Sequence, residues 1–257
     1  IEDKNSEPMY YENLPFRFDT RGIIYNKRAH VYKVNIRTKK FSKIIDGDTK
    51  DIISIESLVE GDKVLVLSFD QYNSKGTMLE EKIGAINGSK IKEIYSKGSM
   101  GNLFYYEDEL HAVGMRKRFD WPTNTTVLKI SNTGKVSYKY RSFDRNIVKA
   151  EMNEAILYFL YEDSGKTLLR DGTNNIDLIN SEVTIKDFAF NNEQMFVIAN
   201  SFSNPDEIYE LNNGQLTKIS KANEFFTKKV KTWDCQYERI DTGKSEIDTW
   251  GIFVGKD

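Results

Sequence analysis

One feature of this sequence constrains its fold more than any other: a pattern that repeats along the chain. The pattern is a short apolar stretch, a turn rich in Asn and Gly, and a second stretch of alternating residues. Its successive first apolar residues lie about 40 to 52 residues apart, the period of a four-stranded β-propeller blade rather than of ankyrin, TPR or leucine-rich repeats. The five copies are "HVYKVNIRTKKFSKII" from His30, "EKIGAINGSKIKEIY" from Glu81, "TTVLKISNTGKVSYKY" from Thr125, "KTLLRDGTNNIDLIN" from Lys166 and "DEIYELNNGQLTKIS" from Asp206.

Each copy is typical of a β-hairpin, here the third and fourth strands of a blade. Asn and Gly recur in the turns because hairpin turns of types I′ and II′ need positive φ angles, which these residues adopt at little cost. Two further strand-like segments lie between copies, for example "NIVKAEM" and then "EAILYFLY". The second of them is continuously apolar, which suits a strand covered on both faces, whereas the alternating third and fourth strands suit positions nearer solvent.

The sequence therefore predicts an all-β protein, a β-propeller of four-stranded antiparallel blades. No window sustains the apolar period of a helix. The blades either close a small ring or form an arc of a larger, seven-bladed propeller. An all-β sandwich is the alternative, which we disfavour because sandwich strands do not usually repeat four at a time. About five blades are expected, over residues 14–45, 51–96, 100–141, 146–180 and 184–220.

Composition excludes several classes of partner. The formal net charge is −2, with lysines interleaved among acids, so no basic face for nucleic acid is expected. The longest apolar run, residues 155–161, is far shorter than the roughly 18 to 20 residues of a membrane span.

The single Cys235 is typical of a reducing compartment, so we expect a cytoplasmic protein. The opening "IEDKNSEPMY" has neither an initiator methionine nor a signal peptide, and indicates a piece of a longer protein.

Two segments carry a resemblance to a known family. The first, "YENLPFRFDTRGIIYNKRAHVYKVNIRTKKFSKIIDGDTKD" (residues 11–51), contains an arginine-bearing hairpin and the blade end "IIDGDTKD". The second, residues 204–257, contains "PDEIYELNNGQLTKIS" and then "CQYERIDTGKSEIDTWGIFV". Both resemble the acylaminoacyl-peptidase-like group of the prolyl oligopeptidase family, the second in its last propeller blade and its crossover into the peptidase domain. The family's Asp-Gly, Ile and Trp positions correspond here to Asp241, Thr242, Gly243, Ile247 and Trp250, with Thr242 as an insertion.

The resemblance implies a propeller over residues 1–240 and a crossover strand over residues 241–257 that leads to an α/β-hydrolase domain. In that family the propeller restricts access to small peptides, and the nucleophilic serine, in a G-x-S-x-G elbow, lies in the hydrolase domain. This chain has no G-x-S-x-G, and both His30 and His111 lie in strand-like segments, where packing or a solvent-facing side chain is the expected role. We therefore expect a chain that is itself non-catalytic, within a parent serine peptidase.

Candidate site residues follow from aromatic and arginine side chains outside the repeat. Two histidines and one cysteine in separate blades predict no metal site, and no cofactor is expected. The irregular segment of residues 9–22, which lies outside the repeat, contains the candidates for gating the substrate chamber. They are Tyr10, Tyr11, Phe16, Arg17, Phe18 and Arg21. The candidates for an interface with the hydrolase domain are Phe119, Trp121 and Trp250.

A second function remains open from the sequence, a free-standing propeller that binds a peptide or protein on one face. A propeller cut open also exposes unpaired strand edges, so the chain is expected to self-associate if it is an arc.

Overall fold

The structure is a computed structural model. It describes residues 17–18, 22–23, 29–45, 50–57, 64–70, 80–87, 89–106, 109–116, 123–131, 133–139, 143–179, 182–233 and 235–252. The chain divides into two compact units, residues 1–123 with 128–139, and residues 124–127 with 140–257. Each unit is described by itself.

The first unit begins with two hairpins. β1 (Arg17–Phe18) pairs antiparallel with β2 (Gly22–Ile23), and β3 (Tyr32–Val34) pairs antiparallel with β4 (Phe41–Lys43). Each pair forms a sheet of two strands within the described ranges. The strands of the first expected blade are thus present, in two separate sheets.

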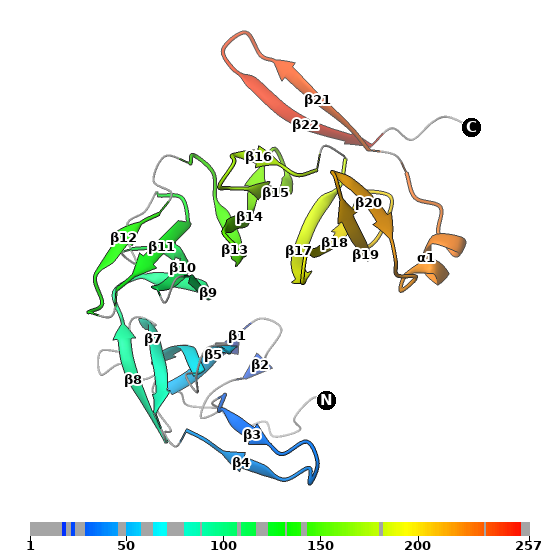
Figure 1. Ribbon diagram of the computed structural model, residues 1–257. Coiled ribbons are helices and arrows are strands. Elements are labelled where there is room, and N and C mark those ends of the chain that lie inside the picture. The colour runs from blue at the N-terminus through cyan, green and yellow to red at the C-terminus, as the bar shows by residue number, and fades with distance from the viewer. Residues whose placement is uncertain are drawn as a thin grey trace, which may run out of the picture. The chain divides into compact units, whose positions relative to one another are not determined.

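Two four-stranded blades follow (Figure 1). In each blade, strands that are neighbours in sequence are neighbours in the sheet, as a propeller blade requires. The first consists of β5 (Lys50–Ser57), β6 (Val64–Asp70), β7 (Glu80–Asn87) and β8 (Lys90–Tyr95). The second consists of β9 (Ser99–Tyr106), β10 (Glu109–Met115), β11 (Thr126–Ile130) and β12 (Val136–Tyr138).

The second unit contains two more blades of the same design, again with sequential strand order. Strands β13 (Ile147–Asn153), β14 (Ile156–Asp163), β15 (Lys166–Asp171) and β16 (Ile176–Asp177) form one of them. Strands β17 (Thr184–Asn191), β18 (Gln194–Asn200), β19 (Glu207–Asn212) and β20 (Gln215–Lys218) form the other. The predicted all-β fold of four-stranded antiparallel blades is confirmed.

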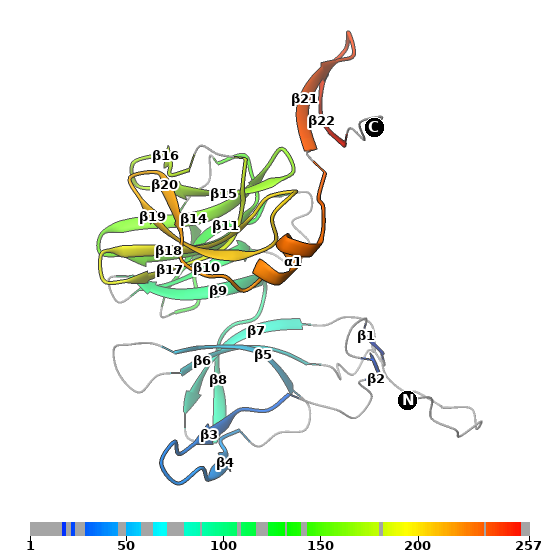
Figure 2. The same ribbon diagram turned by 90° about the vertical axis from the view of Figure 1, so that its right-hand side faces the viewer.

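After the last blade the chain forms a helix and a hairpin. Helix α1 (Glu224–Lys229) buries none of its residues, and β21 (Cys235–Asp241) pairs antiparallel with β22 (Glu246–Ile252). Figure 2 shows this hairpin projecting from one end of its own unit. The sequence did not predict α1, because fewer than two turns cannot display an apolar period. No helix among the described residues is long and apolar enough to cross a membrane.

Packing between neighbouring blades forms the core of each unit. In the second unit one buried cluster joins Leu160 and Leu169 of one blade to Ile185, Phe188 and Val197 of the next. In the first unit a corresponding cluster joins Ile83 of β7 to Leu103, Leu110 and Leu128 of the following blade. His111 is buried in β10 and stacks on Phe104, so of its two expected roles the structure shows packing. Blades that bury apolar faces against each other are the basis of propeller stability.

Burial follows strand position in part. The second strand β10 is buried almost throughout and the fourth strands β16 and β20 are mostly exposed. The second strand β18 was expected to be covered on both faces, but its buried residues alternate with more exposed ones. The third strand β11 was expected nearer solvent but is almost entirely buried, because both of its faces are covered. The predicted turn chemistry is confirmed at Asn213 and Gly214, whose φ angles are 50° and 78°.

A candidate binding groove beside the C-terminal hairpin

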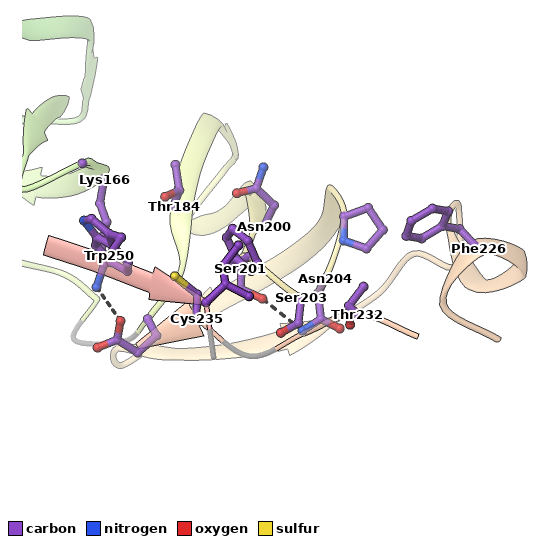
Figure 3. Close-up of a pocket in the computed structure, with 15 residues that line it drawn as sticks. Lys166, Thr184, Asn200, Ser201, Ser203, Asn204, Phe226, Thr232, Cys235 and Trp250 are labelled. Atoms are coloured by element: carbon purple, nitrogen blue, oxygen red, sulfur yellow. Dashed lines mark hydrogen bonds and ion pairs between the residues drawn. The ribbon is translucent and has the colours of Figure 1, made fainter. Parts of the chain in front are cut away.

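The second unit contains a groove of about 690 Å³, here called the hairpin groove (Figure 3). It lies where the β14–β15 turn, the β18–β19 loop, α1 and the β21–β22 hairpin come together. Its lining residues are Gly165, Lys166, Glu182, Thr184, Asn200, Ser201, Phe202, Ser203, Asn204, Pro205, Phe226, Thr232, Cys235, Trp250 and Ile252.

One wall of the groove is a packed contact between Trp250 and the β14–β15 turn. The Lys166 ammonium lies 5.0 Å from the centre of the Trp250 ring and 6.0 Å from that of Tyr237, and it forms an ion pair of 2.7 Å with Glu182. Gly165 has a φ of +74°, and a Cβ atom there would lie 2.9 Å from Trp250 Nε1. The turn therefore needs glycine both for its conformation and for the approach of the indole.

The hairpin strengthens this wall with a polar network on the same face. The Tyr237 hydroxyl donates to Asp248 Oδ1 at 2.5 Å, and Arg239 Nε donates to the same oxygen at 3.1 Å. Hydrogen bonds from Tyr237, Ser164 and Arg239 hold the pKa of Asp248 below its ordinary value. Because Ser164 belongs to the β14–β15 turn, Asp248 provides a second point at which the hairpin is attached to its blade.

The opposite wall is the β18–β19 loop, which its own hydrogen bonds hold in place. Ser201 and Asn204 exchange backbone hydrogen bonds of 3.0 and 3.2 Å. The Asn200 amide donates to Asp206 Oδ1 at 2.6 Å, and Lys186 lies 3.1 Å from the other carboxylate oxygen. These two partners, the Asn200 amide first, lower the pKa of Asp206.

A buried carboxylate fixes the chain between the last blade and α1. Glu207 is 3% exposed and accepts hydrogen bonds from the Ser220 hydroxyl and from the backbone N–H groups of Ala222 and Asn223. Lys218 adds an ion pair of 3.3 Å. The Ser220 hydrogen bond and these donors lower the pKa of Glu207 to about 2, against an ordinary value of 4.5.

The described lining residues of the groove offer hydroxyl, amide, ammonium and aromatic groups that can bind a ligand. No histidine is among its lining residues, so the hydroxyls of Ser201, Ser203 and Thr232 and the thiol of Cys235 have no imidazole base within the groove. In the part of the chain that the structure describes, no group of three His, Cys, Asp or Glu residues could hold a metal ion. A second hollow of about 450 Å³ lies on the other side of Trp250 and Lys166.

The predicted site residues have different places in the structure. Arg17 and Phe18 form β1, where they pair with Ile23 and Gly22. Trp250 lies in the groove wall and is 38% exposed. The candidates that lie outside the described residues are Tyr10, Tyr11, Phe16, Arg21, Phe119 and Trp121.

Sequence reasoning missed most of the groove. Lys166 begins the fourth copy of the repeat and Glu182 lies between the expected blades 146–180 and 184–220, so neither is marked as a site residue. The one available signal was the turn "DSGK", in which Gly165 and Lys166 follow an apolar strand. That signal predicts a hairpin turn but not its contact with Trp250.

Sequential four-stranded blades packed face to face define the chain as a β-propeller. No protein-family model matches it, and neither does any curated protein. Solved structures do resemble it. Pyrococcus horikoshii acylaminoacyl peptidase, in an orthorhombic crystal form, has a TM-score of 0.72 at 16% identity, over 97% of this chain and 40% of that chain.

Two further solved structures are similar. An acylaminoacyl peptidase in complex with Z-Gly-Gly-Phe-chloromethyl ketone has a TM-score of 0.73 at 15% identity, over 99% of this chain and 40% of that chain. Porphyromonas gingivalis dipeptidyl peptidase 4 has a TM-score of 0.51 at 13% identity, over 85% of this chain and 34% of that chain. This chain thus spans 40% of the length of the acylaminoacyl peptidases. The resemblance predicted from the sequence is confirmed at the level of the fold.

Proposed function

We propose that this chain is the non-catalytic gating propeller of a serine peptidase of the acylaminoacyl-peptidase type. The observation that carries the proposal is the fold match over 97% of this chain but only 40% of a peptidase chain. The partner is an α/β-hydrolase domain of the same parent protein, and the β21–β22 hairpin is the crossover toward it. The proposed setting is the cytoplasm, on the ground of the single cysteine.

The contribution of such a propeller is steric. It covers an active site located elsewhere, excludes folded proteins and admits small peptides. In this proposal Tyr10, Tyr11, Phe16, Arg17, Phe18 and Arg21 line the entry, where arginine pairs with a peptide carboxylate. Phe119, Trp121 and Trp250 contact the hydrolase domain. Separated from that domain, the chain self-associates through its open strand edges.

Labelling with a fluorescent fluorophosphonate tests the proposal, because this reagent modifies only activated serines. The full gene product should be labelled at a serine outside residues 1–257, and the 257-residue chain alone should be unlabelled and should not hydrolyse acyl-peptide substrates. A labelled serine within this chain, or a gene product with no labelled serine, would contradict the proposal.

The second candidate function, a free-standing propeller that binds a peptide or protein, is favoured by one observation. The hairpin groove offers about 690 Å³ of mixed polar and apolar lining, a size suited to a short peptide. The same labelling decides between the two functions, since a free-standing binding protein has no reactive serine.

A further inference from the structure

The hairpin of β3 and β4 is an exposed arm with one sign of charge. Every residue from Tyr32 to Lys43 is exposed, and the segment of residues 29–45 contains no Asp or Glu. The cationic residues of this arm are Lys33, Arg37, Lys39, Lys40 and Lys43. In a chain with a formal net charge of −2, this concentration of positive charge is local.

The arm is well formed and fixed at its base. Val31 and Ile45 are buried in a cluster with Ile44, Ile52 and Ile86. At the tip, the backbone N–H of Asn35 donates to the carbonyl of Lys40 at 2.9 Å, and Thr38 N donates to Asn35 Oδ1 at 2.9 Å. The base thus belongs to the core of its unit, while the two strands and the turn are surrounded by solvent (Figure 1).

Large apolar side chains are exposed among the charges. Ile36 is 92% exposed, Phe41 73%, Tyr32 54% and Val34 46%. The register pairs Val34 with Phe41 and Tyr32 with Lys43. Tyr32, Val34, Phe41 and Lys43 therefore lie on one face of the hairpin. Lysines alone would serve to protect an edge from aggregation, but exposed Phe, Tyr and Ile beside them work against that purpose.

The backbone of β4 offers an open edge at Phe41. The Asn35–Lys40 pair is hydrogen-bonded, so the pair two residues along, Lys33–Ser42, is also of the hydrogen-bonded kind. Phe41 lies between Lys40 and Ser42, and its N–H and C=O therefore point away from β3. In the described ranges β4 pairs with β3 alone, and a two-stranded ribbon is marginally stable without a third strand.

We infer that the β3–β4 arm is a docking site for an extended acidic segment of a partner protein, which adds as a strand to the edge of β4. The charge of the arm selects glutamate and aspartate, and the apolar face formed by Tyr32, Val34 and Phe41 selects apolar residues at alternate positions. An open backbone edge favours a polypeptide over a nucleic acid or a lipid surface, because only a polypeptide completes the ladder. This inference depends neither on the proposed gate nor on a hydrolase domain.

Fluorescence anisotropy with a labelled ten-residue peptide of alternating Glu and Val tests the inference on the 257-residue chain. The expected dissociation constant is micromolar, about 1 to 100 μM. A second peptide of the same sequence carries an N-methyl group on every residue, which keeps its charge and removes the N–H donors from both of its edges. It should bind at least about tenfold more weakly.

A matched pair of variants locates the site. The arm variant Arg37→Gln, Lys39→Asn, Lys40→Gln should weaken peptide binding by about tenfold or more. Asn is chosen at Lys39 because φ there is 54°. The control variant Lys228→Gln, Lys229→Gln, Lys231→Gln removes equal charge from the second unit and should leave binding unchanged. Circular dichroism checks that both variants fold.

Three results would overturn the inference. Equal losses in the two variants would mean that only overall charge matters. Equal binding of the N-methylated peptide would exclude strand addition. Displacement of the peptide by duplex DNA or by vesicles of anionic lipid at lower concentration than by unlabelled peptide would assign the arm to that other class of partner.

Discussion

The Lys166 ammonium lies 5.0 Å from the centre of the Trp250 ring, and this contact attaches the C-terminal hairpin to the β13–β16 blade. Glu182 holds the same ammonium at 2.7 Å from the other side, so the lysine is fixed between a carboxylate and an indole. Gly165 and the Asp248 network complete the attachment. The attachment of the hairpin to this blade thus depends on a small set of residues.

Lys166→Met tests the cationic part of the attachment, because methionine keeps the apolar length and removes the charge. The cation–π contact is worth about 0.5–1 kcal/mol at an exposed site. We expect acrylamide to quench Trp250 fluorescence more strongly in the variant, measured with Trp121 and Trp233 replaced by Phe. Lys229→Met, which removes an ammonium 4.1 Å from Phe225 on α1, should leave Trp250 quenching unchanged. Identical effects of the two variants would show that Lys166 has no special role.

Gly165→Ala tests the close approach of the indole to the turn. Alanine at a φ of +74° costs about 1–2 kcal/mol, and its Cβ would also displace Trp250. Gly243 is the matched control, since its φ is +76° and a Cβ there meets nothing within 4 Å. Both variants should unfold at lower temperature, and only Gly165→Ala should increase the quenching of Trp250. If Trp250 responds in neither variant, the packed contact is not present in solution.

Glu207→Gln tests the buried carboxylate through the pH dependence of stability. The folded pKa of about 2 lies below the ordinary 4.5, so ionised Glu207 stabilises the fold fully above pH 4.5. This contribution is lost as pH falls from 4.5 through 2. The difference in melting temperature between wild type and variant should therefore be largest above pH 4.5 and should narrow toward pH 2. Glu238→Gln, at an exposed site, is the matched control substitution. A difference in melting temperature that stays constant with pH would contradict the stabilising role of ionised Glu207.

Trp250→Ala tests the expected interface with the hydrolase domain. In this chain Trp250 is 38% exposed, so its loss should cost about 1 kcal/mol or less of unfolding free energy. In the full gene product, where the proposal covers this side chain, the loss should be about 3 kcal/mol or more, as for a large core aromatic. Denaturant unfolding of both proteins measures the difference. An equal, large loss in both would assign Trp250 to the core of the propeller.

Local sequence patterns predicted most of the fold. The four hairpins β7–β8, β11–β12, β15–β16 and β19–β20 form where the repeated pattern predicts them, because each is specified by residues close together in sequence. The register of β21 and β22 also places Ile247 and Trp250 on opposite faces, as strict alternation requires. Helix α1 was not predicted because its six residues are too few to show a period.

The candidate site was much harder to predict. The contact of Lys166 with Trp250 joins a blade turn to a distant hairpin, and no local pattern specifies which turn an exposed tryptophan meets. The exposure of both strands of the β3–β4 arm could not be predicted either, since lysines in an alternating strand are typical of an ordinary solvent-facing edge.

Substrate size selectivity of the full gene product tests the central proposal most directly. The second-order rate constant kcat/KM would be measured for acyl-peptides of about two, ten and forty residues that share one cleavage site, and for an unfolded protein that contains it. A gating propeller predicts efficient turnover of the short peptides, a fall of at least about a hundredfold at forty residues, and no turnover of the protein. Equal rate constants for all four substrates would contradict the account.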